Sequence, residues 1–104
     1  MSNEISTLYA QLLGETAQIS WTEIMPHFAK GNVLWVASAQ DLVAVAEHII
    51  NDDKKKISAL MQQKALHVLS DDIALDYAQR EPELWAVVVS PWVLVQERCT
   101  PTTH

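Results

Sequence analysis

One long apolar stretch dominates the sequence: Leu84-Trp85-Ala86-Val87-Val88-Val89-Ser90-Pro91-Trp92-Val93-Leu94-Val95-Gln96. Its valines favour an extended backbone, because a β-branched side chain fits a pleated sheet better than a helical turn. Both sets of alternating side chains are apolar, so the stretch predicts a strand covered on both faces, in the centre of a sheet. Ser90-Pro91 predicts a bulge or bend with strand continuing beyond it, because proline cannot donate to the ladder.

Apolar residues at helical spacing predict about five short helices around this stretch. They run from about residue 3 to 16, from a Ser20–Glu23 capping box to Gly31, and over about 40–51, 54–63 and 72–80. Two short strands are expected at 33–37 and 66–69. The sequence thus predicts a small α+β domain over residues 1–97, with a three-stranded sheet and the helices packed on it. We expect a polar, disordered tail at 98–104.

Length, charge and cysteine content narrow the class of protein. A chain of 104 residues predicts one domain, and its single cysteine, Cys99, excludes an internal disulfide and fits a reducing cytoplasm. The net charge of −6 would repel phosphate backbones and disfavours nucleic-acid binding. The first residues do not resemble a signal peptide, and the longest apolar run is too short for a membrane span. We therefore expect a cytoplasmic protein that binds neither nucleic acid nor membrane.

The sequence contains no recognisable catalytic signature. Gly14 and Gly31 are its only glycines and stand apart, so no glycine-rich phosphate loop exists. There is no Cys-x-x-Cys or His-Glu-x-x-His motif. The sequence predicts no catalytic residue and no cofactor, and it favours a non-enzymatic role.

Three residues form a candidate acidic ligand site: Asp41, His48 and Asp52. An imidazole and carboxylates together suit zinc, manganese or iron. His48 and Asp52 are four residues apart and would share one face of a continuous helix. The competing interpretation is that the aspartates cap helices and the histidine is solvated, and the sequence favours it.

The tryptophans provide the remaining signal, because four in 104 residues are many. Tryptophan is common both in cores and at interfaces. If the segment from Trp92 to Gln96 formed a sheet edge, Pro91 and Trp92 would frame a surface for strand addition. Core and interface both remain open for Trp92.

The chain also resembles a known family of small bacterial proteins, catalogued only as a domain of unknown function. The resemblance covers about residues 12 to 97. Its most specific part is Leu84 to Val89 together with Pro91 to Gln96. Other matching positions are Glu15-Thr16-Ala17, Trp21, Phe28, Gly31, Val33, Val36, Asp41-Leu42-Val43, Val45-Ala46 and Ser70-Asp71. The resemblance implies a bacterial, cytoplasmic protein, and it carries no activity, substrate or catalytic residue.

Two functions are compatible with these observations. The first is a non-enzymatic protein-interaction or self-associating module, a homo-oligomer or the partner of another protein, with an interface at Trp85, Pro91, Trp92 and Leu94. The alternative is a small-molecule or divalent-metal-binding protein with the acidic site at Asp41, His48 and Asp52.

Overall fold

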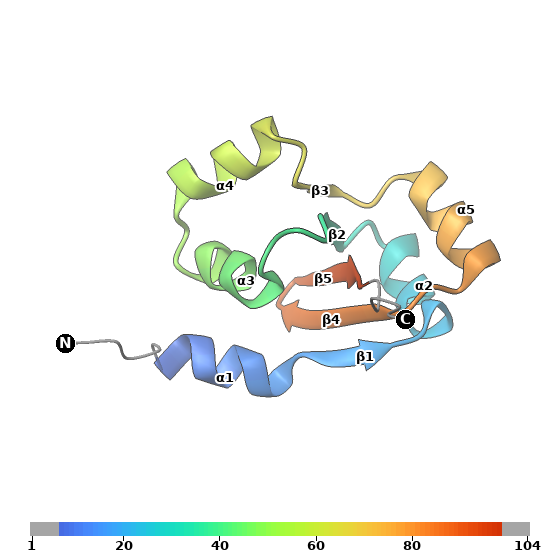
Figure 1. The fold of residues 1–104 in the computed structure, drawn as a ribbon, viewed down its shortest axis with the longest axis horizontal. Coiled ribbons are helices and arrows are strands. Elements are labelled where there is room, and N and C mark those ends of the chain that lie inside the picture. The colour runs from blue at the N-terminus through green and yellow to red at the C-terminus, as the bar shows by residue number, and fades with distance from the viewer. Residues whose placement is uncertain (1–6, 99–104) are drawn as a thin grey trace, which may run out of the picture.

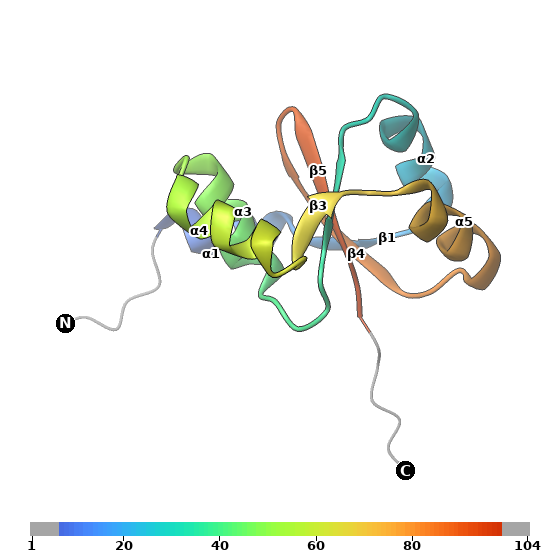
Figure 2. The same cartoon turned by 90° about the horizontal axis from the view of Figure 1, so that it is seen from above.

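Within residues 7–98, the part of the chain that the computed structural model describes, a five-stranded sheet forms the middle layer and helices cover both of its faces (Figure 1 and Figure 2). The helices are α1 (Thr7–Glu15), α2 (Trp21–Ala29), α3 (Leu42–Ile50), α4 (Lys54–Gln62) and α5 (Asp71–Arg80). The strands are β1 (Ala17–Ile19), β2 (Val33–Val36), β3 (Leu66–Val68), β4 (Leu84–Val89) and β5 (Trp92–Glu97). Every helix within these residues is too short or too polar to span a lipid bilayer.

The apolar stretch forms the centre of the sheet, as its two apolar faces predicted. The strands lie in the order β1-β4-β5-β2-β3. β5 pairs antiparallel with β4 and parallel with β2. Leu94 therefore stands between Val87 on one side and Leu34 on the other.

The prediction of an α+β fold with five helices is confirmed, but the expectation of three strands is wrong, because the sheet has five. The apolar stretch does not continue as one bent strand. It reverses at Ser90-Pro91, so that β4 and β5 pair side by side with Val89 opposite Trp92. The other additional strand is β1, which pairs with β4 at the sheet edge. Three residues are too few for an alternating pattern to reveal a strand.

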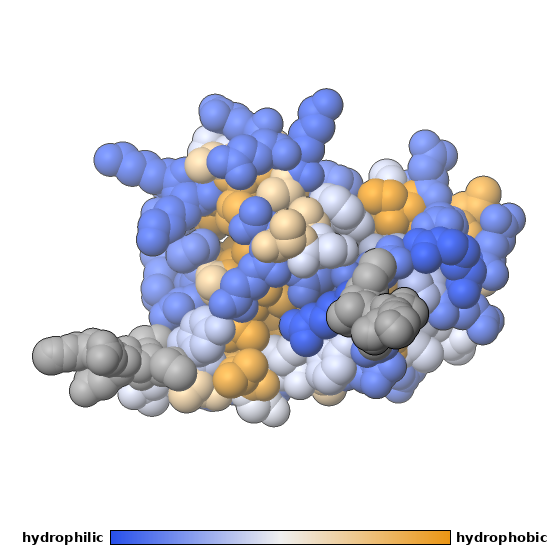
Figure 3. Space-filling view, viewed as in Figure 1, coloured by the Kyte–Doolittle hydropathy of each residue, from blue (hydrophilic) through white to orange (hydrophobic). Residues whose placement is uncertain are grey.

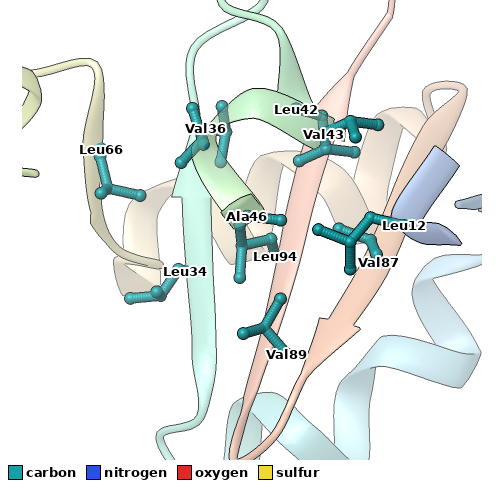
Figure 4. Packing of buried hydrophobic residues seen from close by; sticks show 11 residues of the cluster. Leu12, Leu34, Val36, Leu42, Val43, Ala46, Leu66, Val87, Val89 and Leu94 are labelled. Carbon is teal, nitrogen blue, oxygen red and sulfur yellow. The ribbon is translucent and has the colours of Figure 1, made fainter. Parts of the chain in front are cut away.

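The two faces of the sheet bury separate apolar clusters. Helices α1, α3 and α4 cover the face that carries Leu34, Val36, Leu66, Val87, Val89 and Leu94 (Figure 4). Helices α2 and α5 cover the other face, where the buried residues are Ile24, Val33, Leu69, Ala74, Tyr77, Leu84 and Val95. The helical layers extend to either side of the sheet in Figure 2.

The helix ends follow the local signals in the sequence. The Ser20 side chain accepts a hydrogen bond from the Glu23 N–H, and the Glu23 carboxylate accepts one from the Ser20 N–H, so the predicted capping box is present. Gly31 adopts φ 76°, a left-handed conformation that glycine tolerates without strain. Pro26 lies inside α2. Cys99 and the rest of the expected tail beyond Arg98 lie outside the described residues.

Candidate functional site

Two of the predicted interface residues lie at the tip of the β4–β5 hairpin, between the two helical layers (Figure 2). Pro91 is exposed in the turn, and Trp92 is half-buried at the start of β5. Leu94 is 0% exposed and packs inside the core of the monomer (Figure 4). The structure thus leaves Pro91 at the surface, packs Trp92 partly against the core of the monomer, and makes Leu94 unavailable to a partner.

Trp85 lies at the opposite end of the hairpin from Trp92. It pairs with Gln96, about 13 Å along β4 from the residue opposite Trp92. Its indole N–H donates to Glu83 Oε2 at 3.0 Å, and the Arg98 guanidinium lies 4.8 Å from its ring centroid, within range of a cation–π contact. Trp85 is therefore engaged within the monomer, away from the hairpin tip.

The hairpin tip carries a further apolar residue that the sequence did not single out. Val88 is 60% exposed, and it faces the side of the sheet opposite to Trp92, because Val88 pairs with Val93 and Trp92 pairs with Val89. We call Val88, Pro91 and Trp92 the hairpin tip. A continuous apolar run does not show where a helical layer stops, which is why Val88 was read as covered. β5 has neighbours on both edges, so strand addition to it has no free edge.

Asp41, the first residue of the predicted acidic site, is the N-cap of α3. Its Oδ1 accepts hydrogen bonds from the Val43 N–H at 3.0 Å and the Ala44 N–H at 3.3 Å. Its Oδ2 accepts a hydrogen bond from the Tyr9 hydroxyl at 2.7 Å, which ties α1 to the start of α3. That hydrogen bond raises the pKa of Tyr9, together with its burial and the negative charges of Asp41 and Glu47. Both oxygens of Asp41 already have donors.

The structure does not assemble Asp41, His48 and Asp52 into a metal site. His48 lies in the last turn of α3, about 10 Å along the helix from Asp41. The helix ends at Ile50, and Asp52 has a left-handed φ of 54°, so the shared face expected for His48 and Asp52 is broken. Within residues 7–98, no three His, Cys, Asp or Glu side chains gather closely enough to hold a metal ion.

Asp41 and His48 nevertheless line one groove. It has a volume of about 220 Å³ and lies between α3 and α4. The apolar part of its lining consists of Ala44, Val45, Ala59 and Leu60. The polar part consists of Gln40, Asp41, His48, Lys56 and Gln63. Apolar side chains show in the hollow between these helices in Figure 3, and hydrophilic side chains surround it. We call this feature the α3–α4 groove.

The most strongly perturbed ionisable groups lie at α5, away from this groove. Burial raises the pKa of Tyr77 to about 12, even though the Trp35 indole N–H donates to its hydroxyl at 3.1 Å. Arg80 donates to the Asp76 and Glu97 carboxylates, and its hydrogen bonds to Asp76 lower the pKa of that acid. These groups join α5 to β2 and β5, which is a structural role.

Comparisons with known proteins found one matching family and one similar solved structure. The model of a family described as "Protein of unknown function (DUF2288)" matches residues 7–97, which confirms the resemblance drawn from the sequence. The solution NMR structure of PA1075 from Pseudomonas aeruginosa is similar to this one, with a TM-score of 0.81 and 50% sequence identity, over 100% of this chain and 97% of that chain. No curated protein matches the chain.

Proposed function

We propose a function for this protein, which belongs to the family DUF2288, described only as a protein of unknown function. Since the family carries no activity, the proposal is drawn from the surface of the molecule. The proposal is a non-enzymatic interaction module that self-associates through the hairpin tip. The observation that carries it is the exposure of apolar side chains on both faces of one hairpin end, where Val88 is 60% exposed and Trp92 is half-buried.

The chemistry of the hairpin tip supports a docking role. Valine, proline and tryptophan offer apolar area that is removed from water on contact, at roughly 25 cal/mol per Å². Trp92 has few rotatable bonds and a large ring, which is why tryptophan is enriched among residues that dominate binding. The tip is also held in place, because Val93, the next residue, donates its N–H to the Asn32 carbonyl at 2.9 Å.

The distribution of charge favours a second copy of this chain as the occupant. The protein has a net charge of −6, so two copies repel each other over most of their surfaces. Residues 84–96 contain no charged side chain, so the hairpin tip is a place where two copies can meet with little repulsion. A twofold axis through the contact would place the same residues of both copies against each other. So small a patch predicts a weak dimer that dissociates on dilution.

The test compares two single substitutions that add the same charge to equally exposed apolar positions. Val88→Lys alters the hairpin tip, and Leu75→Lys alters α5, where Leu75 is 59% exposed against 60% for Val88. We measure mass by light scattering over a concentration series for the wild type and both variants. The wild type should show a dimer at high concentration, Val88→Lys should remain monomeric, and Leu75→Lys should behave as the wild type does.

The control separates a specific surface from a general effect of charge. If Leu75→Lys weakens the dimer as much as Val88→Lys, the contact is not at the hairpin tip. A wild type that stays monomeric at the highest soluble concentration contradicts the proposal outright. Far-UV circular dichroism of each variant should match the wild type, because both substituted side chains are exposed.

A ligand site around Asp41 and His48 is the second candidate function. The observation that favours it is that both residues line the α3–α4 groove. The divalent-metal form of this hypothesis lacks such support, because both Asp41 oxygens accept hydrogen bonds and Asp52 is outside the lining. The small-molecule form retains the groove itself.

A further inference from the structure

We propose that the α3–α4 groove binds a small organic anion, a carboxylate with a short aliphatic body, whose carboxylate lies between His48 and Lys56. This inference rests on the second candidate function and names its ligand class. It is independent of the hairpin tip. Of the two ligand classes that the sequence left open, a small molecule or a divalent metal, it selects the small molecule.

The two helices present matching stripes to the groove. From α3 and its N-cap the lining residues are Asp41, Ala44, Val45 and His48, at spacings of three, four and seven residues. From α4 and its C-cap they are Lys56, Ala59, Leu60 and Gln63, at the same spacings. These spacings place each set on one face of its helix. Each helix thus offers a polar residue, an apolar turn and another polar residue.

Lys56 places a positive charge at one end of the groove. Only residues 51–53 separate α3 from α4, and the Asp53 N–H donates to the His48 carbonyl at 2.9 Å, so the last turn of α3 adjoins the first turn of α4. His48 and Lys56 flank this turn. Neither side chain makes a hydrogen bond or ion pair with another residue in the range 7–98. Their N–H donors are available for a carboxylate.

The groove gives a reason for the three consecutive lysines at the start of α4. Lys54, Lys55 and Lys56 occupy the first turn of α4, where positive charge opposes the helix dipole at a cost of about 0.3–1 kcal/mol each. Asp52 and Asp53 precede these lysines and offset part of their charge, and of the three lysines only Lys56 lines the groove. Electrostatic attraction of an anion to this helix end is a function that accounts for keeping lysines there despite their cost in helix stability.

Asp41, the acidic residue of the groove lining, does not compete with an anionic ligand for Lys56. Both oxygens of Asp41 are occupied by the Val43 and Ala44 N–H groups and by the Tyr9 hydroxyl. Asp41 also lies about 10 Å along α3 from His48, at the opposite end of the lining. Its negative charge therefore directs an anionic head group towards the end with His48 and Lys56.

The size of the groove limits the ligand. Its volume of about 220 Å³ corresponds to roughly seven water molecules. The alanines and Leu60 along its floor favour an unbranched aliphatic body rather than a ring with polar substituents. Hexanoate has the required carboxylate and length, and we use it as the probe.

The test is an NMR titration of ¹⁵N-labelled protein with hexanoate, with its neutral isostere hexanamide, and with hexylammonium. Hexanoate should shift amide signals of α3 and α4, with a Kd on the order of 1 mM for so small a ligand. Hexanamide should bind about fivefold more weakly, as expected for loss of a partly exposed ion pair. Acetate, which lacks the aliphatic body, should also bind more weakly than hexanoate.

Two lysine substitutions provide the matched control. Lys56→Met and Lys55→Met remove the same charge from neighbouring positions of α4, but only Lys56 lines the groove. Lys56→Met should weaken hexanoate binding about fivefold, and Lys55→Met less than twofold. Equal losses would mean that general electrostatic attraction accounts for binding, and the proposed position of the carboxylate would be wrong.

The other outcomes separate the ligand class from the site. If hexanamide or hexylammonium shifts the groove signals as strongly as hexanoate, the groove binds ligands but the anionic class is wrong. If none of the three compounds shifts these signals at 50-fold the expected Kd, the small-molecule function of the groove fails altogether. Neither outcome affects the oligomer test, because the hairpin tip shares no residue with the groove lining.

Discussion

Gln96 is the buried polar side chain on which the start of α3 depends. It is 2% exposed, in the central strand β5. Its Nε2 donates to the Ala37 carbonyl at 2.8 Å and to the Gln40 carbonyl at 2.6 Å, and its Oε1 accepts from Arg98 Nε at 3.2 Å. The loop that it holds ends at Asp41, the cap of α3. We therefore expect Gln96 to contribute more stability than a surface hydrogen bond does.

The substitution Gln96→Glu keeps the shape of the side chain and removes its two donors. The Gln40 carbonyl is left without its donor, at a cost of about 1–3 kcal/mol, whereas the Ala37 carbonyl still accepts from the Gln40 N–H at 3.0 Å, so the free energy of unfolding should fall by about 1–3 kcal/mol at pH 7. The introduced carboxylate faces two carbonyl oxygens in a buried place, which favours its protonated form, and only the Arg98 guanidinium at its other oxygen opposes this. Its pKa in the folded state should lie above the unfolded value, so the loss of stability should shrink as the pH falls towards 4.3.

The assay is urea unfolding followed by tryptophan fluorescence, at pH 7 and at pH 5. Ser38→Ala is the control, because the Ser38 hydroxyl donates to the Glu97 carbonyl at 2.7 Å from the same loop but is exposed. It should cost about 0.5–1.5 kcal/mol, with no difference between the two pH values. If Gln96→Glu costs no more than Ser38→Ala at pH 7, the role assigned to Gln96 is refuted. A change in m-value would instead indicate a change in the unfolded or native ensemble.

Two further predictions concern groups described above. The pKa of Tyr77 is about 12 in the folded protein and about 10 in the unfolded chain, so the unfolded chain loses this proton first as the pH rises. The free energy of unfolding of the wild type should therefore fall by about 2–3 kcal/mol relative to Tyr77→Phe between pH 9 and pH 12, in denaturant melts at each pH. Parallel stability curves for the two proteins would contradict this. Asp41→Ala should lower the free energy of unfolding by about 1–2 kcal/mol through loss of the α3 cap, whereas Asp41→Asn should cost only a few tenths, because asparagine caps equally well. Equal costs in thermal melts would show that the charge, not the cap, is what matters.

Helices and their ends could be predicted from the sequence because their signals are local. The capping box at Ser20 and Glu23 and the left-handed Gly31 each depend on residues within one or two turns. The strand count could not be predicted, because pairing is not local. Ala17 of β1 pairs with Ala86, far along the chain, and nothing in three residues marks that partner. The stretch from 84 to 96 reads as one covered strand or as two, since both halves are apolar on both faces.

The candidate sites show the same division between local and non-local information. The sequence predicted Asp41 at a helix cap and singled out His48 as a candidate ligand residue. Both residues line the α3–α4 groove. It paired His48 with Asp52 by assuming a helix that continues past Ile50, where the chain instead turns. Lys56 was not singled out, because spacing along the sequence does not show which helix lies across the groove from it. Val88 was missed because exposure depends on where the helices of another layer end.

The central strand connects the two proposed surfaces physically. β5 begins at Trp92, at the hairpin tip, and reaches the rim of the α3–α4 groove through the Gln96 hydrogen bond to the Gln40 carbonyl. A strand couples two sites only if it has two discrete arrangements. β5 is paired on both edges, and four of its six side chains are buried, so a shift by one residue would exchange side chains between the two separately packed faces of the sheet. The fold therefore places the proposed association surface and the proposed ligand groove at opposite ends of one fixed element, which leaves each free to act without the other.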